Sequence, residues 1–162
     1  GEVMGIDMNF GAAFAKSQLC AGQGLPKSGK VFLSVKDEDK RHIAFLSKKL
    51  FELGFDIVST QGTAKVLRSS GVDVEVVDKK GEGENNVLAL IKKGEMQLVI
   101  NTPSGKKSQS DMRSIRAAAI LHNVPCITTL QGAWAAVNGV EAGLRYSPSV
   151  KALQDYYSYI DK

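Results

Sequence analysis

Apolar residues along the chain follow two alternating patterns, short unbroken runs and longer segments with helical spacing. The runs have the length and β-branched content of buried strands and lie at residues 31–35, 55–59, 72–77, 98–100 and 124–127. The segments between them carry apolar residues three or four positions apart, as amphipathic helices do, and lie at residues 39–53, 64–70, 86–93, 111–121 and 131–142. The pattern therefore predicts five strands that alternate with helices.

This alternation predicts the fold class. Strands separated by helices form βαβ units, which build a parallel sheet with helices on both faces. Right-handed crossovers leave few ways to wind such a sheet, and five strands are too few for a closed α/β barrel. We expect an α/β fold with an open, doubly wound, five-stranded parallel sheet, a three-layer α/β/α arrangement of the flavodoxin-like kind.

The two ends of the chain differ from this regular part. An alanine-rich helix is predicted at residues 10–19, and residues 21–29 have the Gly, Pro and Ser content of a flexible connector. Such a helix either packs on this domain or is the tail of a different, preceding domain. At the other end, Val150, Leu153, Tyr157 and Ile160 predict a final amphipathic helix. Within the chain, Ser108 and Asp111 have capping-box spacing, which predicts that a helix begins there.

Composition narrows the class of protein. A length of 162 residues with 43% apolar residues suits one globular domain. No apolar run has the length of a membrane helix and the first residues lack a signal-peptide pattern, so we expect no membrane association. Two distant cysteines, Cys20 and Cys126, indicate reduced thiols in a cytoplasmic protein. The net charge of +4 is spread along the chain and aromatic residues are few, which favours a small anionic ligand over nucleic acid.

The chain offers one recurrent chemical feature, polar residues that directly follow the predicted strands. Residues 59–63 (Ser-Thr-Gln-Gly-Thr) form a strand-to-helix turn, where hydroxyls, backbone N–H groups and the helix dipole favour a phosphate. In an open α/β sheet these strand ends meet at one edge, where ligands bind. The side chains and glycines expected there are Ser34, Lys36, Asp37, Lys40, Thr60, Gly62, Thr63, Lys79, Asn101, Thr102, Ser104, Gly105, Lys106, Lys107, Thr128 and Thr129. Their hydroxyls, amides and ammonium groups predict a site for a phosphorylated small ligand.

Signals for catalysis are weak by comparison. His42 and His122 fall within predicted helices, and Asp37 and Asp111 suit helix starts. The chain has no Cys/His spacing for a metal, no Walker-type glycine loop and no Gly-x-Ser-x-Gly motif. Trp134 is interpreted as a core or interface anchor. We therefore assign no catalytic residue and no metal ligand.

Several of these motifs together resemble the methylglyoxal-synthase-like (MGS-like) domain, and in particular the version that ends the large chain of carbamoyl phosphate synthase. They are Ser34-Val35 with Lys40, residues 60–64 (Thr-Gln-Gly-Thr-Ala), Lys79 with Gly83, residues 91–94, residues 99–105 (Val-Ile-Asn-Thr-Pro-Ser-Gly), the Asp111, Arg113, Arg116 and Ala119 helix, and residues 128–130 (Thr-Thr-Leu) with Gly132. The opening residues 1–5 and 10–16 resemble the end of the preceding carbamoyl-phosphate-forming, ATP-grasp region. The likeness reaches to about Val140.

The resemblance implies an allosteric domain rather than a catalytic one. Residues 1–29 would be the tail and connector of the preceding domain, and residues 30–162 the regulatory domain. Its effector would be a nucleotide monophosphate such as UMP or IMP, held at the phosphate by Lys40, Thr60, Thr63, Lys79, Asn101 and Ser104, with Gly62, Thr102 and Gly105 in the same loops. Ser34 and Asp111 would lie toward the sugar and base, and Thr128 near a border site for ornithine.

The resemblance also implies a parent enzyme. That parent would be a glutamine-hydrolysing, ATP-dependent ligase of arginine and pyrimidine biosynthesis, working with a glutaminase small subunit and using ATP with Mg or Mn. The domain itself would need no cofactor. The partners of the domain would be the nucleotide effector and the preceding synthetase domains of the same chain.

Two departures from the family pattern bear on the effector. Cys126 stands where some members have an aromatic residue near the ornithine site, which argues against ornithine control, and Glu84 stands where some have arginine. A carboxylate near a phosphate site weakens anion binding.

Two alternatives to a nucleotide-binding regulatory domain remain open. The first is a methylglyoxal synthase acting on dihydroxyacetone phosphate with a carboxylate base in the loop of Glu84. The histidines of that enzyme family are absent, since Lys36 and Ser108 stand in their places. The second is a structural or oligomerising domain without a ligand.

Overall fold

The fold is seen in a computed structural model of the chain, which describes residues 2–79, 85–102 and 105–157, with only the backbone described for 105–109. The strands are β1 (Gly29–Val35), β2 (Phe55–Ser59), β3 (Glu75–Val76), β4 (Leu98–Thr102) and β5 (Cys126–Ile127). The helices are α1 (Phe10–Cys20), a 3-10 turn η1 (Asp37–Asp39), α2 (Lys40–Glu52), α3 (Gln61–Ser69), α4 (Val87–Lys92), α5 (Gly105–Leu121), α6 (Leu130–Arg145) and α7 (Leu153–Tyr157).

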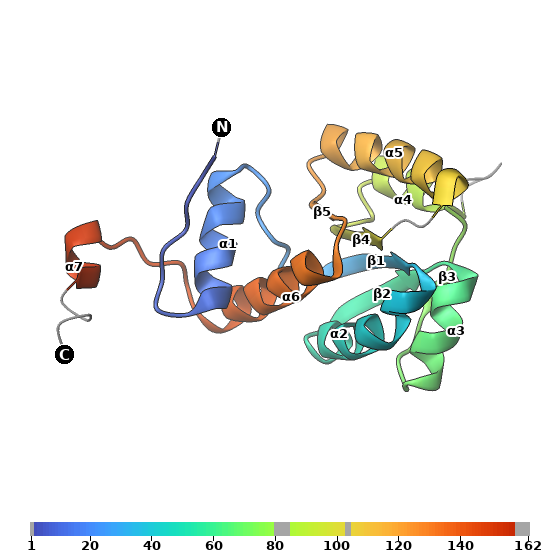
Figure 1. The fold of residues 1–162 in the computed structure, drawn as a ribbon, viewed down its shortest axis with the longest axis horizontal. Helices are drawn as coiled ribbons and strands as arrows, with labels where there is room; N and C mark the ends of the chain where they lie inside the picture. Colours follow the sequence, from blue (N-terminus) through green and yellow to red (C-terminus); the bar gives the residue numbers. More distant parts are fainter. Residues whose placement is uncertain (1, 80–84, 103–104, 158–162) are drawn as a thin grey trace.

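The five strands form one parallel sheet in the order β3-β2-β1-β4-β5 (Figure 1). The prediction of an open, doubly wound, five-stranded parallel sheet is confirmed. Winding reverses between β1 and β4, whereas the flavodoxin strand order places the reversal between the first and third strands. The crevice at this switch point, at the carboxyl ends of β1 and β4, is where doubly wound sheets bind ligands.

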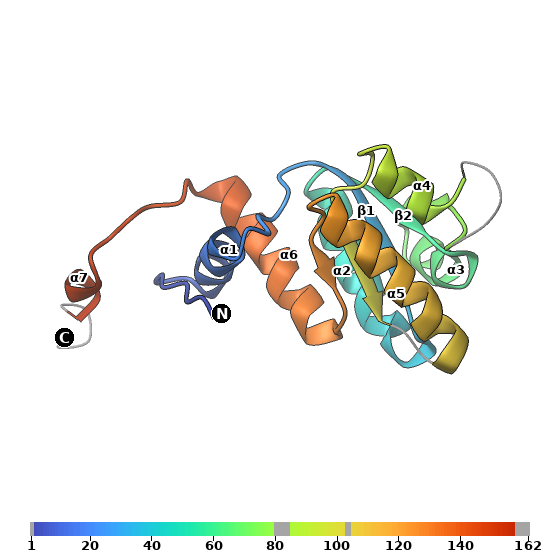
Figure 2. The same cartoon turned by 90° about the horizontal axis from the view of Figure 1, so that it is seen from above.

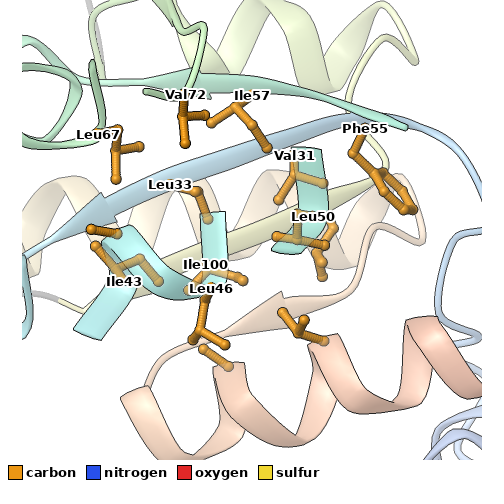
Figure 3. Close-up of a cluster of buried hydrophobic side chains, with 14 of the residues drawn as sticks. Val31, Leu33, Ile43, Leu46, Leu50, Phe55, Ile57, Leu67, Val72 and Ile100 are labelled. Carbon is orange, nitrogen blue, oxygen red and sulfur yellow. The ribbon is translucent and has the colours of Figure 1, made fainter. Parts of the chain in front are cut away.

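Helices cover both faces of the sheet and create two separate hydrophobic cores (Figures 1 and 2). On one face α2, α3 and α6 contribute Leu46, Leu67 and Val137 to a core with β1 and β4 (Figure 3). On the other face α4 and α5 contribute Ile91 and Ile115. Each of these five side chains is completely buried. Because the central strands are covered on both faces, they appear in the sequence as unbroken apolar runs.

Glycines end two of the helices that lead into the sheet. Gly54 after α2 and Gly94 after α4 adopt positive φ angles of 89° and 74°. Only glycine adopts this left-handed conformation without a steric cost, so it stops the helix and turns the chain back toward the next strand. Glycine positions, together with apolar periodicity, therefore indicate in the sequence where a helix ends and the next strand follows.

Several predicted boundaries are wrong, among them those of α5, α3 and β3. Helix α5 begins at Gly105, so Ser108 and Asp111 lie inside it and form no capping box at its start. Helix α3 begins at Gln61, which makes residues 61–63 its first turn instead of a connecting loop. Strand β3 contains only Glu75 and Val76, because the preceding valines are buried without pairing.

The chain ends are arranged differently from each other. Helix α1 packs mainly on α6, outside the three-layer body (Figure 2). The predicted C-terminal helix is reduced to α7, with Val150 outside it and Leu153 and Tyr157 exposed. The predicted amphipathic packing of this segment is therefore wrong for its described residues, and Ile160 lies outside them.

Candidate functional site

Three polar side chains line the carboxyl ends of the central strands. Ser34 of β1 is paired in register with Asn101 of β4, and on the other side β1 and β2 are paired up to Leu33 and Ser59. Thr60 follows Ser59, and its Oγ1 lies 3.2 Å from Ser34 Oγ. The structure thus places Thr60, Ser34 and Asn101 in a row across the switch point, as expected for residues at the carboxyl ends of neighbouring parallel strands.

The first turn of α3 adjoins this row. Thr60 is the N-cap residue, and among the described residues its side chain makes no capping hydrogen bond. Gln61 and Gly62 are exposed, so the positive end of the helix dipole faces the site. A Cβ atom at Gly62 would lie 3.8 Å from Lys40 Nζ, which places the ammonium group beside this turn. An anion bound here would meet both a helix N-terminus and a lysine.

Lys40, the first residue of α2, is paired with Asp37 of the preceding 3-10 turn η1. Its Nζ lies 2.6 Å from Asp37 Oδ1, and 23% of the lysine side chain is exposed against 92% for the aspartate. An ion pair with so exposed a partner contributes little to stability. Asp37 therefore orients Lys40 without cancelling its charge for a bound anion.

Thr63 and Thr102 serve the framework of the site. Both side chains are buried, and the Thr63 hydroxyl accepts a hydrogen bond from the Val35 N–H at 3.3 Å. The Thr102 hydroxyl accepts one from the Lys36 N–H at 3.2 Å. The Lys36 N–H also donates to the Thr102 carbonyl oxygen at 3.1 Å, so the Thr102 hydroxyl shares that amide. Both threonines bind a backbone amide at the end of β1, and their predicted role at the sheet edge therefore includes fixing the shape of this strand end.

The side-chain amide of Asn101 has one oxygen without a hydrogen-bond partner among the described residues. The residue is completely buried, and its Nδ2 donates to Met112 Sδ of α5 at 3.2 Å. Its Oδ1 is buried and has no hydrogen-bond partner among the described residues. A thioether is a weak acceptor, and a buried carbonyl oxygen without a donor costs free energy. The Oδ1 of Asn101 therefore lacks a donor that the described residues could have supplied. The sequence analysis did not single out Met112, because a methionine within a predicted helix carries no signal for a contact with a particular strand residue.

Lys79 and Asp111, two further predicted site residues, attract each other from different elements. Lys79 follows β3 and Asp111 belongs to α5, and each is half-buried. Burial lowers the pKa of Lys79 from its ordinary value, and attraction to Asp111 offsets part of that effect. The ammonium group is thus less well solvated than a surface lysine and has more to gain from a bound anion.

The structure describes the remaining predicted site residues in less detail. Thr128 follows β5 and is half-buried. Gly105 is the first residue of α5. Ser104 and Glu84 lie outside the described residues, as do the side chains of Lys106, Lys107 and Ser108.

Two searches of the described ranges (2–79, 85–102 and 105–157) gave negative results. They contain no group of three or more His, Cys, Asp and Glu side chains placed to hold a metal ion. In the same ranges no helix has both the length and the apolar character needed to cross a membrane.

Comparison with known proteins identifies the family. Residues 42–128 match the family model for the MGS-like domain. The chain belongs to the MGS-like domain family. This MGS-like domain is 49% identical over 159 residues to the carbamoyl phosphate synthase large chain of Rubrobacter xylanophilus, a match that covers 98% of the domain and 15% of that protein. It is 50% identical over 156 residues to the C-terminal section of the Methanocaldococcus jannaschii carbamoyl phosphate synthase large chain, covering 96% of the domain and 25% of that section.

Solved structures support the fold of this MGS-like domain. Methylglyoxal synthase from Elizabethkingia anophelis aligns with a TM-score of 0.57 at 16% identity, over 82% of the domain and 92% of that enzyme. The crystal structure of ForH aligns with a TM-score of 0.52 at 19% identity, over 74% of the domain and 83% of that chain. At such low identity these likenesses show the fold alone.

The environment of Cys126, at the predicted border site, gives a first prediction. Burial raises the pKa of this thiol to about 11, while Cys20 is exposed. At about pH 8 the thiolate fraction of Cys126 is then on the order of one in a thousand. We expect a disulfide reagent such as DTNB to label Cys20 rapidly and Cys126 only slowly, which the Cys20→Ser variant would confirm by losing the fast phase. Equal rates for the two thiols would contradict the buried position of Cys126.

Proposed function

We propose that this MGS-like domain is the effector-binding, regulatory end of a carbamoyl phosphate synthase large chain and that it binds a nucleotide monophosphate such as UMP or IMP. The observation that carries the proposal is the buried Oδ1 of Asn101, which lacks a partner among the described residues in a polar row with Ser34 and Thr60. Lys40 and Lys79 add positive charge around that row. A ligand with a phosphate and hydroxyl groups matches these groups better than an apolar molecule does.

The contacts proposed for the nucleotide follow from this arrangement. The phosphate would meet the first turn of α3, Thr60, Lys40 and Lys79, with Ser104 and Thr102 at the neighbouring strand end. Asn101 would bind through either end of its amide, because the weak bond to the Met112 sulfur is lost at small cost. Ser34 and Asp111 would face the sugar and base.

The same residues argue against a chemical step on the ligand. General acid–base catalysis near neutral pH needs a group that titrates there. Lys36 and Ser108 occupy the positions at which the resemblance places the histidines of methylglyoxal synthase. The proposed domain therefore senses a phosphate compound, and its effect arises from different affinities for two states of the parent protein.

The parent protein is the second part of the proposal. The domain spans 15% of the Rubrobacter relative, so the rest of such a chain would supply the catalytic machinery. Residues 1–29 would derive from its preceding ATP-grasp domain, and a glutaminase small subunit would complete the enzyme. The parent would use ATP with Mg or Mn in the arginine and pyrimidine pathways of the cytoplasm. Thr128 would lie near any ornithine site at the domain border.

Isothermal titration calorimetry tests the proposal directly. We expect UMP or IMP to bind the chain with measurable heat and inorganic phosphate to compete. No heat from either nucleotide at millimolar concentration would contradict a nucleotide site. Dihydroxyacetone phosphate serves as the matched test of enzymatic activity, and clear production of methylglyoxal from it would overturn the regulatory proposal.

The pH dependence of binding gives a further prediction. Lys79 attracts an anion only when protonated, and burial lowers its pKa in the free protein. We therefore expect nucleotide affinity to fall, as the pH rises, already below the ordinary lysine pKa of about 10.4, with proton uptake on binding, while the phosphate itself is already ionised. In Lys79→Arg the affinity should fall less steeply over the same pH range, since arginine stays charged and the nucleotide base is then the group that still titrates. An unchanged pH profile in that variant would assign the titration to a different group.

A further inference from the structure

Both ends of the described chain lie on the side of α1 that is far from the strand ends of the candidate site (Figure 1), and Tyr156 near one end contacts Ile6 near the other. The N-terminal arm, residues 2–9, lies against α1 at Gly5, where a Cβ atom would overlap the Ala13 carbonyl oxygen. Lys16 of α1 then holds the arm at two points. Its Nζ lies 2.7 Å from Asp7 Oδ2 and donates a hydrogen bond to the Ile6 carbonyl oxygen at 3.2 Å.

Tyr156 of the C-terminal segment, residues 146–157, joins the same cluster. Its hydroxyl donates to the Ile6 carbonyl oxygen at 3.1 Å and lies 3.5 Å from Lys16 Nζ. Lys151 Nζ lies 5.0 Å from the centre of the tyrosine ring, within cation–π range. Residues from three separate parts of the chain therefore converge on one backbone carbonyl group.

The cluster is charged and partly shielded from water. Only 22% of the Asp7 side chain and 18% of the Lys16 side chain are exposed. The hydrogen bond from Lys16 lowers the pKa of Asp7, and the same bond raises the pKa of Lys16. Both groups are therefore ionised at neutral pH, and their hydrogen bonds are of the stronger, charge-assisted kind.

The rest of the C-terminal segment is poorly anchored. Val150, Leu153 and Tyr157 are exposed, so apolar burial does not hold the segment in place. A cavity of about 440 Å³ separates residues 146–149 from α1 and the connector, with Asp7, Lys16, Leu25, Val140 and Pro148 in its wall. The segment thus crosses this cavity, and beyond the cavity the Tyr156 hydroxyl attaches the segment to the N-terminal arm.

Helix α6 connects this cluster to the candidate site. It begins at Leu130, directly after the end of β5, with Thr129 Oγ1 accepting from the Gly132 N–H at 3.1 Å. It ends at Arg145, next to the C-terminal segment, and carries α1 on its surface (Figure 2). One continuous helix therefore links the carboxyl edge of the sheet to both the arm and the segment that holds it.

We propose that residues 146–157 form a clasp that fastens the N-terminal arm to α1 and so fixes the direction in which preceding chain enters the domain. Opening the clasp would free the arm without disturbing the sheet. A second role of the clasp rests on the proposed function. The clasp would transmit effector binding through α6 to the preceding domains, because an arm released from α1 would no longer hold those domains in a fixed orientation.

The test compares two tyrosines one residue apart. Tyr156→Phe removes the hydroxyl that binds Ile6 and keeps the ring, whereas Tyr157→Phe removes a hydroxyl from an exposed side chain. Backbone 15N relaxation is measured on the 162-residue chain. In the wild type and in Tyr157→Phe, the order parameters of residues 3–8 should be about 0.8. In Tyr156→Phe they should fall below about 0.6. A second variant, Lys16→Met, should release the arm in the same way.

An arm that stays ordered in Tyr156→Phe, whether or not Lys16→Met releases it, would overturn the clasp. In the full-length parent, the measurement is the factor by which saturating UMP or IMP changes the apparent affinity for ATP. This factor should move toward one in Tyr156→Phe and should stay unchanged in Tyr157→Phe. A wild-type parent that ignores both nucleotides would refute the proposed function, while the relaxation measurement would still decide the clasp. An unchanged factor in Tyr156→Phe, with the arm released, would overturn the transmission role alone.

Discussion

Replacing Lys40 by alanine is expected to weaken binding of UMP or IMP by about 10- to 100-fold, because a hydrogen bond to a charged group contributes about 1.5–3 kcal/mol. Lys40 Nζ stands beside the first turn of α3, where a phosphate would also meet backbone N–H groups. Titration calorimetry on wild type and variant measures the change. The fold should be unaffected, since the partner of Lys40, Asp37, is 92% exposed and their ion pair adds little stability.

Lys48→Ala is the matched control for this prediction. Lys48 lies on the same helix, α2, and is exposed at some distance along it from the carboxyl edge of the sheet. Its loss removes the same charge from the protein but should leave nucleotide affinity within about twofold, as expected for a screened surface charge. Equal effects of the two substitutions would indicate general electrostatic attraction, and no effect of either would place the anion elsewhere.

The fold could be predicted well from the sequence where burial is two-sided. Strands β1, β2 and β4 are covered on both faces, so every position tends to be apolar and the runs stand out. Strand β3 was predicted too long because Val72 and Val74 are as apolar as strand residues. They are buried against the helices before pairing begins, and a propensity for strands does not distinguish packing from pairing.

The candidate site could be predicted in composition but not in detail. Parallel strands bring their ends together whatever the side chains, so Ser34, Thr60 and Asn101 were expected at one edge and lie there. The internal hydrogen bonds depend on register and distance, which the sequence does not contain. For this reason two features emerge only from the structure: the hydrogen bonds of the Thr63 and Thr102 hydroxyls to backbone amides, and an Oδ1 of Asn101 without a partner among the described residues.

The start of α5 shows the limit of local sequence signals. Residues 105–110 contain no apolar side chain, so no apolar periodicity indicates a helix there. Ser108 and Asp111 have the spacing of a capping box, although they lie inside the helix. The helix nevertheless runs from Gly105 and carries Met112 and Ile115 into the core on that face of the sheet. Tertiary packing at its far end stabilises a first turn that its own residues do not favour.

Gly11→Ala is expected to destabilise the protein by about 1–3 kcal/mol, although alanine is the better helix former. Gly11 is buried where α1 crosses α6, and a Cβ atom there would overlap the Asn138 carbonyl oxygen and lie 3.2 Å from Ala142 Cβ. Both neighbours belong to α6, and a backbone carbonyl cannot rotate away as a flexible side chain can. The helices would have to separate, which loses the close packing that seats α1 on the domain.

Gly143→Ala is the matched control for the helix crossing. Gly143 lies in α6, and a Cβ atom there would meet nothing within 4 Å, so alanine should add about 0.5–1 kcal/mol of stability through its helix propensity. Urea unfolding followed by the fluorescence of Trp134, which lies on the same helix, reports both changes. For a protein of this size each kcal/mol shifts the melting temperature by about 2–4 °C, so the two variants should melt on opposite sides of the wild type. If Gly11→Ala were as stable as Gly143→Ala, α1 would not be seated on α6 in solution, and the clasp at Lys16 would have no fixed surface against which to hold the arm.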